Sequence, residues 1–181
     1  MLHLKYFKES TSPIISDIDI EWVRSHFDEE SFGSFDGHID PDRGSIDMDI
    51  SKCLKLGDEI IGCYCLQKLS ILEVIERVKY WTEEDEYPLY KDLKFFFKDT
   101  DLFENKLGIF GDYLYILPEY RSKKHADILI EYSKTLGDYN WGITSGYKPE
   151  KYWIENKGRT RICEYTEMDG TINIINSTIP N

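Results

Sequence analysis

A cluster of basic residues follows a short apolar run near the middle of the chain. The cluster consists of Arg121, Lys123, Lys124 and His125, and it overlaps the turn Pro118-Glu119-Tyr120-Arg121. If a helix begins here, its unpaired backbone N–H groups and the positive end of its dipole lie beside these cations. Such a site suits a pyrophosphate. A plain solvated helix face fits the same residues, so both interpretations stay open.

The segment around this basic cluster predicts a strand, a turn and a helix. Residues 112–117 are rich in Tyr, Leu and Ile, which suit a half-buried strand, and Pro118 ends the strand because it lacks a ladder donor. Ser122 can cap the helix that follows. The apolar face of this helix recurs at helical spacing and consists of Ala126, Leu129, Ile130 and Ser133.

Length, composition and charge restrict the class of protein. The 181 residues, 41% hydrophobic and 14% aromatic, predict one globular domain over 1–181. The net charge of −12 disfavours nucleic acid as a partner and favours a cationic partner or an amine substrate, although it also simply keeps a protein soluble. No apolar run is long enough to span a bilayer, and the first six residues lack the plan of a signal peptide. We therefore expect a cytoplasmic protein with no membrane partner.

The first third of the chain predicts a helix, a loop and a hairpin. Ser16 through Glu30 favours a helix that Ser16 or Asp17 caps, whereas Leu2–Tyr6 is a weak strand prediction. A glycine-rich and aspartate-rich run over 31–45 then predicts turns. Its candidate metal ligands, which are Asp36, His38, Asp40 and Asp42, fit no calcium loop, so we expect no metal site. Two strands joined at Gly57-Asp58 form the predicted hairpin within 46–69.

Cysteine usage gives no disulfide framework. Cys53, Cys63, Cys65 and Cys163 show no Cys-x-x-Cys spacing, and Cys63 and Cys65 would share one face of a strand. We predict buried free thiols.

Residues 70–107 stand between the hairpin and the basic segment. Ser70–Trp81 predicts an amphipathic helix, and Leu89–Leu107, which contains Phe95-Phe96-Phe97, predicts a further helix or an irregular stretch. Core packing is the default for these aromatics. A docking surface for a protein partner or a second copy of the chain is the alternative.

The last third predicts a strand over 139–145, a helix over 148–157 and a hairpin over 159–179. Pro149 suits the first turn of that helix and Gly158 suits its end. Gly142, inside the strand, predicts a close backbone approach or a bulge.

The run LYILPEYRSKKHA over 114–126 resembles the acyl-CoA segment of the GNAT superfamily of N-acyltransferases. That family follows its strand with Pro-Glu-Tyr-Arg and then Arg/Gln-x-x-Gly-x-Gly/Ala. Arg121 and Ala126 match this pattern, whereas Lys124 stands where the first glycine belongs. The order of elements from the central strand to the end is also similar to the family's C-terminal half.

The resemblance implies an α/β fold, with one domain built on a mixed, mostly antiparallel sheet flanked by helices, and with 70–107 as an insertion. It implies transfer of an acyl group from acetyl-CoA or another acyl-CoA to an amine. The residues that it assigns to the cofactor are Leu117, Arg121, Ser122, Lys123, Lys124, His125 and Ala126.

Candidates for acid–base chemistry are fewer. Asp112 and Glu119 flank the central strand and are the candidate bases, while each also fits a plain surface carboxylate. The tyrosine that many family members use as an acid falls on Ile154, and Tyr152 is nearby but rotated by roughly 200° on the helix.

A catalytically inactive GNAT-fold protein, as in some short-tailed bacteriophage particles, is therefore the alternative function. Modification of a nucleic-acid base is a third hypothesis, which the net charge disfavours.

Overall fold

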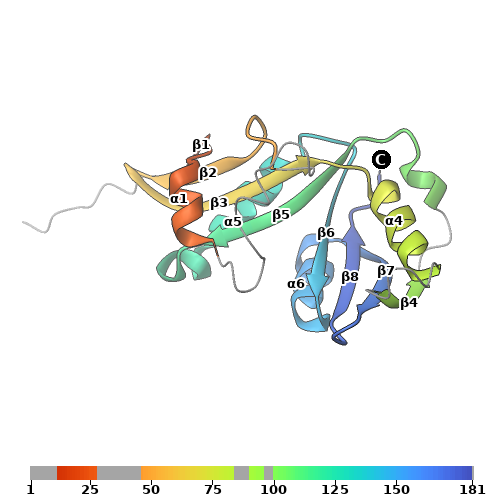
Figure 1. The fold of residues 1–181 in the computed structure, drawn as a ribbon. Helices are drawn as coiled ribbons and strands as arrows, with labels where there is room; N and C mark the ends of the chain where they lie inside the picture. The colour runs from red at the N-terminus through yellow and green to blue at the C-terminus, as the bar shows by residue number, and fades with distance from the viewer. Residues whose placement is uncertain (1–11, 28–45, 84–89, 96–99, 181) are drawn as a thin grey trace, which may run out of the picture.

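A mixed sheet of eight strands runs through the described part of the chain (Figure 1). The structure is a computed structural model, and it describes residues 12–27, 46–83, 90–95 and 100–180. The strands lie in the order β1-β2-β3-β5-β6-β8-β7-β4, and the pair β5–β6 is parallel whereas every other neighbouring pair is antiparallel. This architecture confirms the α/β prediction of one domain on a mixed, mostly antiparallel sheet.

The helices and strands have the following bounds: β1 Ile14–Asp17, α1 Ile20–His26, β2 Lys52–Leu56, β3 Glu59–Lys68, α4 Ile71–Glu83, β4 Tyr90–Phe95, η2 Thr100–Phe103, β5 Gly108–Ile116, η3 Pro118–Lys123, α5 His125–Ser133, β6 Tyr139–Ser145, α6 Tyr147–Lys157, β7 Thr160–Glu167 and β8 Ile172–Ser177.

Helices cover both faces of the sheet because side chains alternate along each strand. On β3, Cys63 packs under α1 whereas Tyr64 packs under α5. On β6, Trp141 packs under α4, and the next residue, Gly142, faces the end of α6. Helices α1 and α4 therefore share one face of the sheet, and α5 and α6 share the other (Figure 1).

Several predicted elements are confirmed. The β2–β3 hairpin turns at Gly57-Asp58, α4 buries Ile71, Ile75 and Val78, and β7 and β8 form the last hairpin. At the end of α6, Gly158 has φ +66°, as its predicted capping role requires. All four cysteines are buried and free.

The predicted helix from Ser16 to Glu30 is wrong in its first residues. Ser16 and Asp17 belong to β1, which pairs with β2, and an Asp17–Lys52 ion pair of 2.9 Å joins the two strands. The helix begins at Ile20, because the side chain of Asp19 accepts a hydrogen bond from the N–H of Trp22 at 3.0 Å.

The prediction of a helix or irregular stretch over 89–107 is wrong for residues 90–95. Residues 90–95 form β4, which pairs with β7, and η2 buries Phe103 in the core beneath α4. Pairing with a distant strand overrides the local pattern. Two predictions, the strand Leu2–Tyr6 and the loop carrying Asp36, His38, Asp40 and Asp42, lie outside the described residues.

Candidate functional site

Strands β5 and β6 separate after three paired positions. The parallel pairs are Gly108–Tyr139, Ile109–Asn140 and Phe110–Trp141, and residues 111–116 have no partner on β6. We call the space between the two strands beyond these pairs the fork. A register shift against β3, where Cys65 pairs with Tyr113 and Leu66 with Gly111, places a bulge at Asp112 beside it. A gap in the centre of a sheet leaves main-chain groups available to a ligand.

Two main-chain amides of β5 point into the fork. The N–H of Leu117 donates to the carbonyl of Ile61 on β3 at 2.9 Å, so alternate residues of β5 face β3 and the amides of Leu114 and Ile116 face the other way. The carbonyl oxygen of Ile116 accepts a hydrogen bond from Nε of Arg121 at 2.9 Å. Arg121 therefore stands at the mouth of the fork.

The turn after β5 differs from the prediction. Residues 118–123 form the 3-10 helix η3, and α5 begins at His125 rather than beside Ser122. Ser122 does not cap α5: the residue before the helix is Lys124, with φ +57° and ψ +20° and no capping side chain. A left-handed residue here redirects the chain, so strand, turn and helix are present, but the residue before the helix is Lys124 rather than Ser122 and the helix starts two residues late.

A basic pocket lies at the start of α5. It has a volume of about 290 Å³, and its lining residues are Arg121, Lys124, Ala126, Asp127, Tyr152, Asn156 and Lys157. Three of these carry positive charge and one carries negative charge, so the pocket is locally cationic on a protein of net charge −12. Asp127 forms an ion pair with Lys157, which links α5 to the end of α6. Burial is the largest single effect on the pKa of Lys157 and lowers it, but the hydrogen bonds and charges of Asp127 and Tyr152 together outweigh burial, so the pKa is raised.

Not every residue predicted for the pyrophosphate reaches this pocket. His125 is 7% exposed, and its Nδ1 lies 3.2 Å from the carbonyl oxygen of Tyr120, so its ring packs inward. The N–H of Leu117 donates to the carbonyl oxygen of Ile61 on β3, and Leu117 does not line the pocket. The side chains of Ser122 and Lys123 are outside what the structure describes. Arg121, Lys124 and Ala126 are the predicted residues that the fold brings together.

The three candidate acid–base residues lie apart. Asp112 is half-buried on the bulge of β5. The hydrogen bond with Cys63, burial and, to a smaller degree, the charge of Asp112 raise the pKa of the nearby Cys65. Glu119 is exposed on η3, whereas Tyr152 lines the basic pocket on the α5 and α6 face.

Two further residues meet where β5 and β6 separate, and the sequence analysis did not select either as functional. Tyr64 of β3 is 2% exposed, and a methyl group on Gly111 would lie 2.1 Å from its hydroxyl oxygen. Arg159 is 5% exposed, and its Nη1 would lie 2.9 Å from a methyl group on Gly142. The sequence signal that could have identified Tyr64 and Arg159 is the glycine on each side of the fork, Gly111 and Gly142, because a glycine inside a strand marks the close approach of another group.

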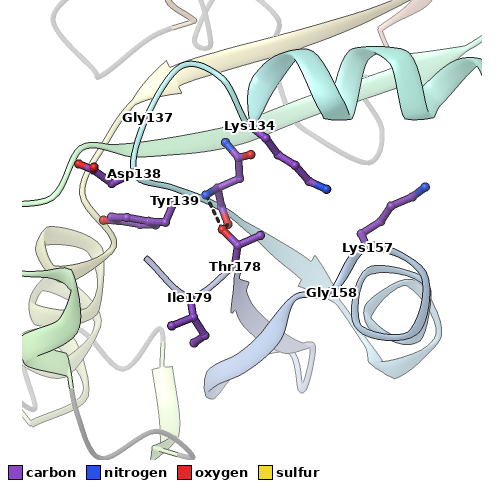
Figure 2. A pocket seen from close by; sticks show the side chains of 9 residues that line it. Lys134, Gly137, Asp138, Tyr139, Lys157, Gly158, Thr178 and Ile179 are labelled. Carbon is purple, nitrogen blue, oxygen red and sulfur yellow. Dashed lines mark hydrogen bonds between the residues drawn. The ribbon is translucent and has the colours of Figure 1, made fainter. Parts of the chain in front are cut away.

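A second hollow adjoins the basic pocket at Lys157, which lines both (Figure 2). Its volume is about 320 Å³, and it lies where the ends of α5 and α6 meet the start of β6. Lys134, at the end of α5, and Lys157 of α6 both line this space (Figure 2). The N–H of Asn140 donates to Oγ1 of Thr178 at 2.9 Å. The two hollows together follow the line between α5 and α6.

The described residues give no sign of two other kinds of site. Among them, no group of three or more His, Cys, Asp or Glu side chains is placed to hold a metal ion. None of the helices in the same part of the chain is long and apolar enough to cross a bilayer.

Solved structures of other proteins share this architecture. Over 94% of this chain, the structure matches 99% of NAA60 from Arabidopsis thaliana in complex with a bisubstrate analogue, with a TM-score of 0.57 at 10% identity. It also matches 98% of the loading GNATL domain of CurA from Lyngbya majuscula over 93% of this chain, with a TM-score of 0.54 at 13% identity. The chain has the GNAT fold.

A third match extends this likeness. The ribosomal-protein-S18-alanine N-acetyltransferase from Escherichia coli aligns over 94% of this chain and 95% of its own, with a TM-score of 0.51 at 11% identity. No protein-family model matches the sequence, and neither does any curated protein. At these identities the likeness establishes the GNAT fold alone.

Proposed function

We propose that this protein is an N-acyltransferase that moves an acyl group from acyl-CoA to an amine. The observation that carries the proposal is the fork between β5 and β6, with the basic pocket at its mouth. NAA60, which shares the fold, has been solved in complex with acetyl-CoA and with a bisubstrate analogue.

The residues present suit the parts of acyl-CoA. Arg121, Lys124 and Lys157 give the pocket three cations for the pyrophosphate, and the start of α5 adds the positive end of a helix dipole. The amide of Leu114, which faces the fork, suits an extended arm or a carbonyl oxygen. An acyl-CoA supplies the acyl group as a thioester, already activated for attack by an amine.

The proposed transfer needs a base for the amine and a proton donor for the sulfur. The amine nitrogen attacks the carbonyl carbon, the carbon–sulfur bond breaks, and the amine loses a proton while the leaving sulfur gains one. Asp112, on the bulge of β5, is the proposed base for the amine, and Glu119 is the alternative. Tyr152 is the candidate proton donor to the sulfur, although it lines the same pocket as the proposed pyrophosphate site.

Helix α4, in the segment 70–107, covers the same face of the sheet as α1. Helix α4 packs there on β6, β7 and β8, and β4 extends the sheet at β7. We propose that this segment is the insertion in the domain and that it borders the path of the acceptor amine. Its use as a docking surface for a protein partner or a second copy is the alternative.

Calorimetric titration of CoA and acetyl-CoA into the purified protein tests the proposed function. We expect saturable binding, and we expect Lys124→Gln to weaken it about fivefold to tenfold, because a phosphate contact loses its charge. Lys151→Gln is the matched control, since Lys151 is exposed on α6 and does not line the pocket. The absence of saturable binding at millimolar ligand contradicts the proposal.

A second candidate is a GNAT-fold protein that has lost catalysis and serves as a structural or interaction protein, including in a bacteriophage particle. Tyr64 and Arg159 favour this alternative because they occupy the point where the strands separate. Ile154, in place of the expected tyrosine, favours it as well. Steady amine-acylating turnover by the purified protein would exclude it.

A further inference from the structure

Arg159 is a buried cation at the point where β5 and β6 separate. Only 5% of the residue is exposed, and a methyl group built on Gly142 would lie 2.9 Å from its Nη1 and 3.5 Å from the carbonyl oxygen of Gly111. Gly111 and Gly142 directly follow the last parallel pair, Phe110–Trp141. The guanidinium therefore stands at the closed end of the fork, between the two strands.

The side chains around Arg159 hold it in place without neutralising its charge. Its Nη1 donates to Oδ1 of Asn176 at 3.0 Å, its Cζ lies 4.0 Å from the ring centre of Trp153, and the hydroxyl of Tyr64 interacts with it. Burial lowers the pKa of Arg159, and the interaction with Tyr64 opposes that effect. No ion pair joins Arg159 to a carboxylate among the described residues.

The two buried carboxylates of α6 and β7 already have a cation. Glu150 of α6 binds Arg161 through both oxygens, and Glu164 lies 3.5 Å from Arg161 and 3.7 Å from Lys94. A buried cation with only neutral partners is unfavourable, because the interior replaces its hydration poorly. Its planar set of donors matches a carboxylate.

The fork directs the acyl end of a bound thioester toward this guanidinium. In the proposed function the pyrophosphate sits in the basic pocket at the mouth, so the arm runs inward along the unpaired edge of β5. Gly111 and Gly142 carry no side chains at the closed end, and the room that they leave is taken by the hydroxyl of Tyr64 and the guanidinium of Arg159. A ligand group that reaches the closed end therefore meets these two side chains first.

We propose that Arg159 selects an acyl group that itself ends in a carboxylate, so that the donor is a short dicarboxylic acyl-CoA such as malonyl-CoA or succinyl-CoA. This inference rests on the proposed function and names its donor class. The ligand carboxylate supplies the negative charge that the described neighbours of Arg159 do not.

Titration of succinyl-CoA, malonyl-CoA, butyryl-CoA and acetyl-CoA into the full chain tests this selection. We expect at least one of the two anionic esters to bind tenfold or more tightly than butyryl-CoA, which matches succinyl-CoA in chain length without the charge. Arg159→Met should reduce this preference to within twofold while CoA itself still binds. Lys151→Gln, which removes an exposed charge on α6, should keep the preference.

A second variant keeps the test decisive if Arg159→Met fails to fold. Asn176→Asp places a carboxylate on the partner of Nη1, so it should also reduce the preference for anionic acyl groups. Equal binding of the charged and uncharged esters by the wild-type protein overturns the role of Arg159 and leaves the proposed function standing. Failure of every CoA ester to bind contradicts the proposed function itself.

Discussion

At the scale of the residue, Lys124 occupies a backbone conformation that lysine disfavours. Its φ of +57° is left-handed, where a Cβ atom crowds the following carbonyl. Lys124→Gly should raise the free energy of unfolding by about 0.5–1 kcal/mol, because the relief of strain exceeds the extra flexibility of glycine in the unfolded chain. Guanidinium denaturation of the two proteins measures this difference.

Lys134→Gly is the control for this substitution. Lys134 is also exposed and ends α5, but its φ is −67°. Glycine there should lower the free energy of unfolding by several tenths of a kcal/mol, since no strain is relieved. A loss of stability in both variants would contradict the argument about Lys124.

Cys163 should make stability fall with rising pH. Burial raises the pKa of its thiol from 9.0 to about 12, although Lys79 opposes the shift. Between those two values the unfolded chain loses the proton and the folded chain keeps it, so the free energy of unfolding decreases by about 1.4 kcal/mol per pH unit from this group.

Guanidinium denaturation at pH 8, 9 and 10 measures this dependence. Cys163→Ala should show a shallower decrease above pH 9 than the wild-type protein. The comparison of slopes removes the constant loss from the small cavity that alanine leaves. Identical slopes would show that Cys163 ionises as readily in the folded chain as in the unfolded one.

At the scale of the element, an ion pair between charged side chains holds α6 against β7. Its buried Glu150 binds Arg161 of β7, and Arg161 also lies over the ring of Tyr147. Glu150→Gln should lower the free energy of unfolding by about 2–3 kcal/mol, because a partly buried Arg161 loses its main counter-charge. Glu150→Leu combined with Arg161→Met should lose less than the sum of the single changes, which a double-mutant cycle of denaturation midpoints measures.

The meeting of β3, β5 and β6 depends on Gly111. A methyl group there would lie 2.1 Å from the hydroxyl oxygen of Tyr64 and 2.8 and 2.9 Å from two of its ring carbons, and all three distances are too short for a stable contact. Gly111→Ala should destabilise the protein by about 2 kcal/mol through overpacking. Tyr64→Phe removes the closest atom, so it should recover part of that loss. If the losses in the free energy of unfolding from Gly111→Ala and Tyr64→Phe simply add in the double variant, the two side chains are not in contact in solution.

At the scale of the whole molecule, the net charge of −12 governs encounters with polyanions. We expect the protein to bind a 30-base-pair DNA duplex with a Kd weaker than about 10⁻⁴ M at 150 mM salt, since the long-range field repels phosphate. Fluorescence anisotropy of a labelled duplex measures this. Saturation at lower protein concentrations, weakened by added salt, would instead reveal a local basic surface that overrides the net charge.

The sequence predicted the elements whose evidence is local. Strand β5, helices α4 and α6 and the final hairpin follow from apolar spacing, Pro118 and the glycines that end or turn the chain. It failed for β1 and β4, because each exists through pairing with a strand far along the chain. Short strands at a sheet edge carry little periodic signal of their own.

The sequence by itself determined the order of helices and strands in the second half, the cysteine chemistry and the location of Arg121, Lys124 and Ala126 near a helix start. Only the tertiary structure decided that His125 turns inward, that β5 and β6 separate after three pairs, and that Tyr64 and Arg159 meet at the closed end of the fork. The physical reason is the range of the forces: caps, turns and periodicity act over a few residues, whereas burial and charge compensation depend on neighbours that only folding brings together.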